Sequence, residues 1–316
     1  MNLESSYQLS KARIAEPEVS RRAKLYRKFP VKELLKRGWV QISENIEVLE
    51  HRFLEFYSMK SMEDPARFPH AAKSTTYDEP SMIKLAWLNR AKQVAKAVMA
   101  GKYSPAALKA AIPELKACMK HTEEIRTVPV ILAKAGVRLV IIEHIPASKM
   151  DGACFWVDSS SPVIALSLRF DRVDNFWFNL FHEIDHVLHG EGKDDPIYEV
   201  IEQGADGLPP NEIRANAAAS DYCIPRGELD GFVARVSPMF SKQAISGFAL
   251  RLGIHPGIVV GQLQGNGVIH YSHSREMLEK VRGVVTGAVL TDGFGDRKST
   301  RLNSSHIQKS RMPSSA

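Results

Sequence analysis

The sequence lacks the features of membrane and secreted proteins. No uninterrupted apolar run approaches the roughly 20 residues that a membrane-spanning helix requires. The N-terminus has no apolar core of the kind that marks a secretory signal peptide. The chain of 316 residues contains only three cysteines, at scattered positions, which argues against a disulfide framework and against a cysteine-based zinc site. We therefore expect a protein of the reducing cytoplasm that does not engage a membrane.

Acidic residues are absent from the end of the chain, and this absence explains most of the net charge of +6. Residues 297–316 carry five basic residues and no acidic one, so the rest of the chain has a net charge of +1. A net charge so close to zero does not indicate which kind of partner the chain binds. The end of the chain is polar, serine-rich and aperiodic, and we expect residues 291–316 to form a disordered tail that is foreign to the fold.

One stretch carries a specific chemical signal. Residues 182–186 have the pattern His-Glu-x-x-His. On a helix, His182 and His186 lie on the same face one turn apart, so both can bind one metal ion. Glu183 is then placed to accept a proton from a metal-bound water. Flanking apolar residues recur at i, i+3, i+4 and i+7, which predicts a helix with a core-facing stripe, and Gly190 predicts its end.

A catalytic zinc site needs a third protein ligand in addition to two histidines. Glu212 is the best candidate, because Asn211 can cap a helix there and the alanines that follow allow a close approach to a neighbouring helix. The residues alone leave four competitors open: His189, Glu199, Glu202 and Asp221. Three residues could support the ligands or stabilise the transition state: His189, Tyr222 and His270. The charged loop from Glu191 to Asp195 and the segment after it would form a mobile rim of the cleft.

These motifs resemble the ImmA/IrrE family of metallopeptidases. The resemblance is carried by His182 to His189 with the preceding Phe-Asn-Leu-Phe, by the spacing Glu212-x-x-Ala215-Asn216-x-x-Ala219 and by Ile224-Pro225, and it runs from about Val128 to Val281. Two positions depart from the family pattern. Ala218 stands where phenylalanine is usual, and Asp185, where glycine is common, adds negative charge near the metal.

The resemblance implies a zinc-dependent endopeptidase, with His182, His186 and Glu212 as ligands of Zn²⁺ and Glu183 as the general base. The known substrates of the family are DNA-binding repressors, whose cleavage allows expression of the genes that they repress. We therefore expect a protein substrate of this kind. The alternative is a non-proteolytic transcriptional regulator, similar to the family's antitoxin-like members, that uses the domain for sensing or binding.

Four regions are expected along the chain. Residues 1–75 form a basic helical region, residues 76–127 a helical connection, residues 128–290 the metallopeptidase-like domain and residues 291–316 the tail. Family members are often fused to a helix-turn-helix regulator, and no convincing helix-turn-helix is visible in the first region. We therefore expect the chain to be the C-terminal part of such a fusion, with nucleic-acid binding only through a missing or N-terminal region. Aromatic residues among the basic ones of the first region could suit nucleic acid, but a solvated helical face over a small core is favoured.

The third region combines strands with helices. Apolar and β-branched stretches predict strands at 137–142, 152–157 and 162–168, and a hairpin turn at 158–161 joins the last two. The expected fold is α+β, mostly helical, with a small sheet of about three strands packed beside the helix of the His-Glu-x-x-His motif. An edge of this sheet could receive an extended peptide as an added strand.

Residues 241–263 allow a competing interpretation as a DNA-binding helix-turn-helix, because two short helices flank a glycine turn. The second of these helices is apolar and has no Arg, Lys, Asn or Gln at its start to contact bases. We therefore expect this segment to pack in the core behind the metal site.

Overall fold

The computed structural model describes residues 18–65, 81–193, 196–199 and 208–294. The chain divides into two compact units, Met1–Arg90 with Ile145–Ser148, and Ala91–His144 with Lys149–Ala316. The helix α4 (Met82–Ala95) begins in the first unit and ends in the second. The region limits expected at residues 75, 127 and 290 remain predictions. The expected tail lies outside the described residues from position 295 onward.

The smaller unit is built from helices around an aromatic core. Residues 18–28 are helical, and α2 (Val31–Lys36) and α3 (Ile46–Phe56) follow. The ring of Phe29 lies 5.4 Å from that of Phe53 and 4.8 Å from that of Tyr57. Two of the aromatic residues considered for nucleic-acid binding, Phe29 and Trp39, are therefore core residues, since both are buried.

Part of the basic surface of the smaller unit is neutralised within it. Arg21 forms ion pairs with two acidic residues of α3, at 2.9 Å from Glu47 and 2.5 Å from Glu50. Asn45 caps the same helix, because its side chain accepts hydrogen bonds from the backbone N–H groups of Glu47 and Val48. These contacts agree with a helical surface over a small core.

The larger unit contains a mixed sheet. Among the described residues it has five strands in the order β4-β2-β3-β1-β5. They are β1 (Arg138–Ile141), β2 (Gly152–Trp156), β3 (Pro162–Leu166), β4 (Ile197–Glu199) and β5 (Leu290–Thr291). The strands β2 and β3 are antiparallel, and Val157 donates a backbone hydrogen bond to Ser161 across the predicted turn. Strand β1 runs parallel to both β3 and β5.

The sheet differs from the expectation in two ways. The three predicted strands are present, but β4 and β5 were not predicted, because segments of two or three residues are too short to show a period. Strand β4 pairs antiparallel with β2 from Gly152 to Cys154, so β2 is not an edge strand there. The α+β class and the mostly helical composition are confirmed.

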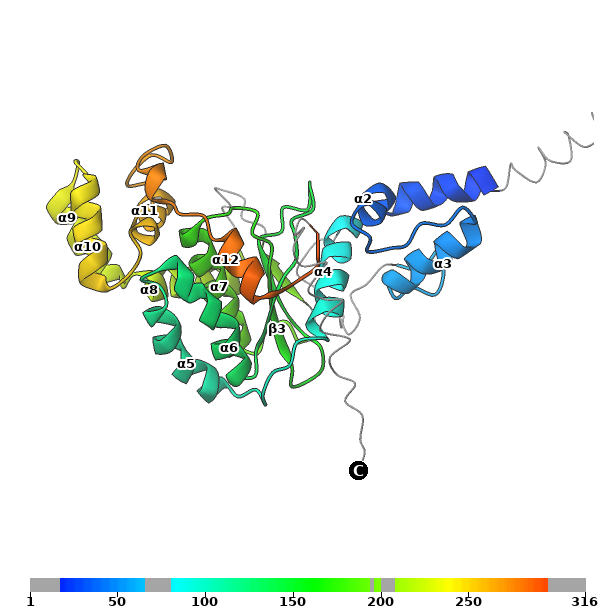
Figure 1. Ribbon diagram of the computed structural model, residues 1–316, viewed down its shortest axis with the longest axis horizontal. Helices are drawn as coiled ribbons and strands as arrows, with labels where there is room; N and C mark the ends of the chain where they lie inside the picture. The colour runs from blue at the N-terminus through cyan, green and yellow to red at the C-terminus, as the bar shows by residue number, and fades with distance from the viewer. Residues whose placement is uncertain (1–17, 66–80, 194–195, 200–207, 295–316) are drawn as a thin grey trace, which may run out of the picture. The chain divides into compact units, whose positions relative to one another are not determined.

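The helices α6 and α7 contact the strands of this sheet directly (Figure 1). In chain order, the α-helices of the larger unit after α4 are α5 (Pro105–Ala117), α6 (Val128–Lys134), α7 (Val173–Leu188), α8 (Pro210–Cys223), α9 (Arg226–Val236), α10 (Lys242–Leu252), α11 (Pro256–Gly265) and α12 (Arg282–Ala288). Two short 3-10 helices, η1 (Thr122–Thr127) and η2 (Arg275–Met277), lie between them.

The helix α7 is the central element of the larger unit. Its apolar stripe is fully buried, as predicted from the helical period of the apolar residues. Burial of each such side chain contributes about 1.5–3 kcal/mol to the free energy of folding. The stripe consists of Trp177, Leu180, Phe181, Ile184 and Val187. The helix ends at Leu188, and Gly190 follows with a φ of +70°, the left-handed conformation that favours glycine. The opposite face is buried as well, since His182, Glu183 and His186 are 0 % exposed. A surface helix with two solvated histidines is thereby excluded.

Residues 241–263 form part of the core. The helices α10 and α11 are bent by 111° relative to each other around Gly253. Ile258, Val259 and Leu263 of α11 are buried, and α11 packs against α7. A helix buried in this way cannot enter a DNA groove, so the expectation of core packing is confirmed. In the part of the chain that the structure describes, no single helix is long and apolar enough to cross a membrane, although α10 and α11 pass that test as a bent pair.

Candidate metal centre

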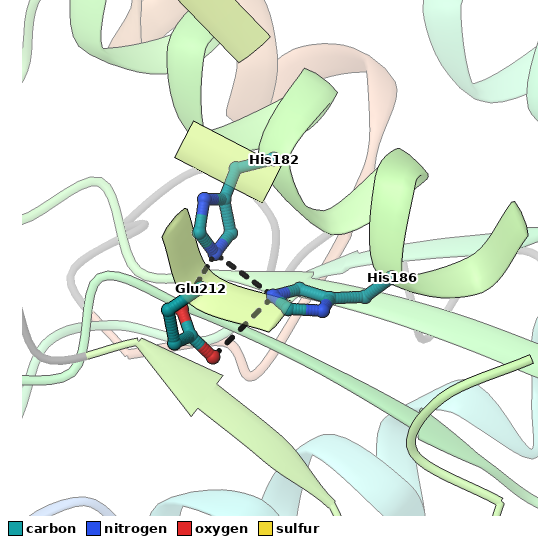
Figure 2. Close-up of side chains that lie close together, drawn as sticks. All are labelled: His182, His186 and Glu212. Atoms are coloured by element: carbon teal, nitrogen blue, oxygen red, sulfur yellow. Dashed lines mark hydrogen bonds and ion pairs between the residues drawn. The ribbon is translucent and has the colours of Figure 1, made fainter. Parts of the chain in front are cut away.

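His182 and His186 of α7 meet Glu212 of α8 at one point inside the larger unit (Figure 2). The two Nε2 atoms are 2.9 Å apart. Oε2 of Glu212 lies 3.2 Å from Nε2 of His182, and Oε1 lies 3.5 Å from Nε2 of His186. All three side chains are buried, with Glu212 at 7 % exposure. The structure therefore brings together the two histidines of the motif and the favoured third ligand.

Hydrogen bonds to the Nδ1 atoms determine the tautomers of both histidines. Nδ1 of His182 lies 3.0 Å from Oδ1 of Asn216, and Nδ1 of His186 lies 2.6 Å from Oε2 of Glu191. Both oxygens can only accept, so each Nδ1 carries a proton and donates it. In the neutral imidazoles, both Nε2 lone pairs then face each other and the carboxylate of Glu212. Such an arrangement is stable when a proton or a metal cation lies between the donors.

This donor set fits a divalent metal ion. Around a tetrahedral zinc ion with bonds of about 2.0–2.1 Å, neighbouring donor atoms are about 3.3 Å apart. The two Nε2 atoms are 2.9 Å apart, and each lies 3.2 or 3.5 Å from one of the two carboxylate oxygens of Glu212, which is close to that spacing. Two imidazoles and one carboxylate are also the donor set of catalytic rather than structural zinc sites. The residues present therefore match the chemistry of a catalytic metal centre.

The electrostatics of the metal-free cluster favour a bound proton. Burial raises the pKa of Glu212, but hydrogen bonds and charges from His182 and His186 outweigh burial and lower it to about 2. Burial lowers the pKa of His186, but the hydrogen bond to Glu212 and the charges of nearby carboxylates outweigh it and raise this pKa above 6.5. When His186 is protonated at Nε2, the proton occupies the place that a metal ion would take.

We expect the affinity of the chain for Zn²⁺ to fall as the pH is lowered through the raised pKa of His186. Metal binding must displace the proton from this ring, so each pH unit below that pKa lowers the apparent affinity by up to about tenfold per proton released. Above that pKa the affinity should level off. Competition with a chromophoric chelator at a series of pH values, corrected for the chelator's own titration, measures the effect. An affinity that does not change with pH would contradict it.

Glu183 is held between α7 and the sheet. A Cβ atom at Gly152 of β2 would lie only 2.4 Å from Oε1 of Glu183, so the carboxylate packs directly against the backbone of this strand. Cys154 of the same strand is close enough that the charge of Glu183 adds to burial in raising the pKa of its thiol. The carboxylate of Glu183, the candidate base, can occupy this position because residue 152 has no side chain.

Two of the competing ligands, His189 and Asp221, do not join the cluster. His189 is 47 % exposed, and its Nδ1 lies 2.8 Å from the backbone oxygen of Asp185 at the end of α7. Asp221 accepts a hydrogen bond from the backbone of Arg226, at 3.0 Å. Glu199 lies in β4, and Glu202 lies outside the described residues. Within the described ranges, the metal-binding group consists of His182, His186 and Glu212.

The other candidates for a supporting role lie apart from this group. Tyr222 of α8 packs on Phe181 of α7 with a ring distance of 5.3 Å. Because Tyr222 follows Glu212 by ten residues on the same helix, the two positions are about 15 Å apart along α8. His270 is exposed and bonds to Ser272 in its own turn, at 2.8 Å. His189 contacts Asp185 rather than a ligand. A transition-state role for these three residues remains a prediction.

Three residues around the ligands were not singled out in the sequence. Asn216 follows Glu212 by one helical turn, so the spacing of the two offered a signal. Glu191 lies in a loop after α7 that was interpreted as a mobile rim, yet it bonds to His186. Arg214 bonds to both Glu191 and Asp185. The negative charge expected from Asp185 is therefore balanced by an arginine at 2.8 Å.

Part of the chain is similar to a known protein family. Residues 134–236 match the family model Peptidase_M78, described as an IrrE N-terminal-like domain. No curated protein matches the chain. The matched segment contains the strands β1 to β4, the helices α7 and α8, and all three residues of the cluster. It supports a metallopeptidase-like domain, and the resemblance seen in the sequence is confirmed. Over residues 134–236 the chain is therefore similar to IrrE N-terminal-like domains.

Proposed function

We propose that the chain is a zinc-dependent endopeptidase that hydrolyses a peptide bond in a regulatory partner protein. The observation that carries this proposal is the convergence of His182, His186 and Glu212, with Glu183 beside them on α7. Two helices supply three ligands of the catalytic type, and a carboxylate adjoins them. The match to a metallopeptidase-like domain supports the same chemistry.

In the proposed mechanism, the protein supplies the metal ligands and a proton carrier. Zinc, when bound, lowers the pKa of a water molecule to about 7 and polarises the carbonyl of the scissile bond. Glu183 accepts a proton from the attacking water and then delivers it to the leaving amine. Asn216 and Glu191 accept hydrogen bonds from the Nδ1 atoms of the two histidines and so keep both Nε2 atoms available.

The substrate we propose is a DNA-binding repressor, which is the theme of the family that the sequence resembles. The test mixes the purified, zinc-loaded chain with candidate repressors encoded beside its gene and identifies products by mass spectrometry. We expect one specific cut that a chelator prevents and that added zinc restores. A chain that binds zinc at this cluster but cuts no partner, and no unfolded model protein, would instead support a non-proteolytic regulator.

Replacing Gly152 with alanine is expected to slow hydrolysis by roughly a hundredfold, because a displacement of about 1 Å in a reacting group can cost that much. The new Cβ would collide with Oε1 of Glu183, which can move away at little cost in stability because it is the end of a flexible side chain. Zinc content and the unfolding temperature should therefore stay close to those of the wild type. The matched control is Gly247→Ala, where a Cβ meets nothing within 4 Å. Unchanged hydrolysis by Gly152→Ala would show that the position of Glu183 is not critical.

A further inference from the structure

We infer that Glu191 is a positioning residue that holds His186 in the tautomer required for metal binding, and that Arg214 holds Glu191. The inference rests on the proposed metal centre. It extends that centre to a loop residue outside the His-Glu-x-x-His motif and to a side chain of α8 that contacts no ligand directly.

Glu191 contacts His186 twice. After α7 ends, the left-handed turn at Gly190 brings the chain back toward the helix, and the backbone N–H of Glu191 donates to the backbone oxygen of His186 at 3.0 Å. The side chain then places Oε2 at 2.6 Å from Nδ1 of the same residue. A carboxylate in this position fixes the ring orientation and makes the opposite nitrogen a better metal donor.

Arg214 fixes the carboxylate of Glu191. Its Nη2 donates to Oε2 of Glu191 at 2.8 Å, and its Nε donates to Oδ2 of Asp185, also at 2.8 Å. The side chain of Asp185 is only 6 % exposed, so its charge requires this partner. The rigid fork of a guanidinium can bridge two carboxylates, which the single ammonium of lysine cannot do with the same geometry. Arg214 thereby connects α8 to both α7 and the loop that follows it.

The backbone of the loop is fixed from the side of the sheet. The indole Nε1 of Trp156 donates to the backbone oxygen of Glu191 at 2.8 Å. The next residue, Gly192, has a φ of +78°, and a Cβ there would lie 2.6 Å from the backbone oxygen of Cys154. The loop is thus packed against β2 at this point. The position of Glu191 is therefore fixed by contacts with α7, with β2 and with Arg214.

The test measures the Zn²⁺ affinity of the full chain by chelator competition, in wild type, Glu191→Ala, Glu191→Gln and Glu228→Ala. Glu191→Ala should weaken zinc binding by about 10- to 100-fold, the usual effect of removing a partner of a metal ligand. Glu191→Gln should recover most of the affinity, because its amide oxygen can still accept from His186. Glu228, which pairs with Arg251 at 2.6 Å on the exposed surface, provides the control, and Glu228→Ala should bind within about twofold of wild type.

The unfolding temperature of the zinc-free chain separates positioning from a merely structural role. Glu191→Ala should keep this temperature within a few degrees while its affinity falls. The inference is overturned if Glu191→Ala binds zinc as the wild type does, or if both Glu191 variants lose affinity and zinc-free stability equally. A wild-type chain that does not bind zinc would overturn the proposed function as well, which distinguishes that failure from the first two.

Discussion

Replacing Glu183 with glutamine is expected to abolish hydrolysis while the chain keeps its zinc. A general base typically contributes about 100- to 10,000-fold to the rate, and the amide of glutamine cannot accept the proton of the attacking water. The substitution preserves the size of a side chain that is fully buried between α7 and β2, so the fold should change little. The ligands His182, His186 and Glu212 are untouched.

The measurement compares the rate of substrate cleavage with the zinc content of the same protein sample. Glu228→Gln serves as the control, because it makes the same chemical change at an exposed residue of α9. The control should cleave at the wild-type rate. Full hydrolysis by Glu183→Gln would reject this residue as the base and leave the metal centre itself in place.

Replacing Glu212 with alanine is expected to remove zinc at concentrations that saturate the wild type. The loss of a direct ligand should exceed the 10- to 100-fold cost of losing an outer partner, so we expect more than about a hundredfold. The change also removes the hydrogen bond from Glu212, which contributes most to raising the pKa of His186. The metal-free cluster should therefore hold its proton less tightly, with two imidazoles left and no buried carboxylate between them.

Thermodynamic linkage gives a direct measurement of this loss. A ligand at a thousandfold excess over its Kd stabilises the fold by about 4.1 kcal/mol, and at a tenfold excess by only about 1.4 kcal/mol. The stabilisation of Glu212→Ala by zinc should shrink by at least that difference. Asp221→Ala is the control on the same helix, because Asp221 was a competing candidate and caps the backbone of Arg226 instead. Loss of zinc from Asp221→Ala, with retention by Glu212→Ala, would place the third ligand elsewhere.

The convergence of the three candidate ligands could be predicted from the sequence because helical spacing determines which residues share a face. Residues four apart must share a face, so His182 and His186 follow from the period alone. Glu212 required more: its distance from the histidines depends on how α8 packs on α7, and the small residues between Glu212 and Ala219 were the available signal. The buried stripe of α7 and the three longer strands follow from the same rules of period and composition.

The parts that could not be predicted depend on contacts between segments without a period. Glu191 reaches His186 through a turn whose direction is set by Gly190, and no spacing rule describes such a turn. Arg214 is one of many arginines in the sequence, and only the packing of α8 shows that it bridges two carboxylates. Strand β4 forms by pairing with β2. A segment of three residues is too short for its own sequence to predict this pairing.

The burial of α11 against α7 determines how small a working piece of this protein can be. The matched segment ends at residue 236, whereas α11 begins at Pro256. A fragment trimmed to residues 134–236 would leave an apolar side of the ligand-bearing helix in water, where contiguous exposed apolar surface promotes aggregation. The His-Glu-x-x-His motif and the proposed third ligand thus belong to a folding unit larger than the matched segment.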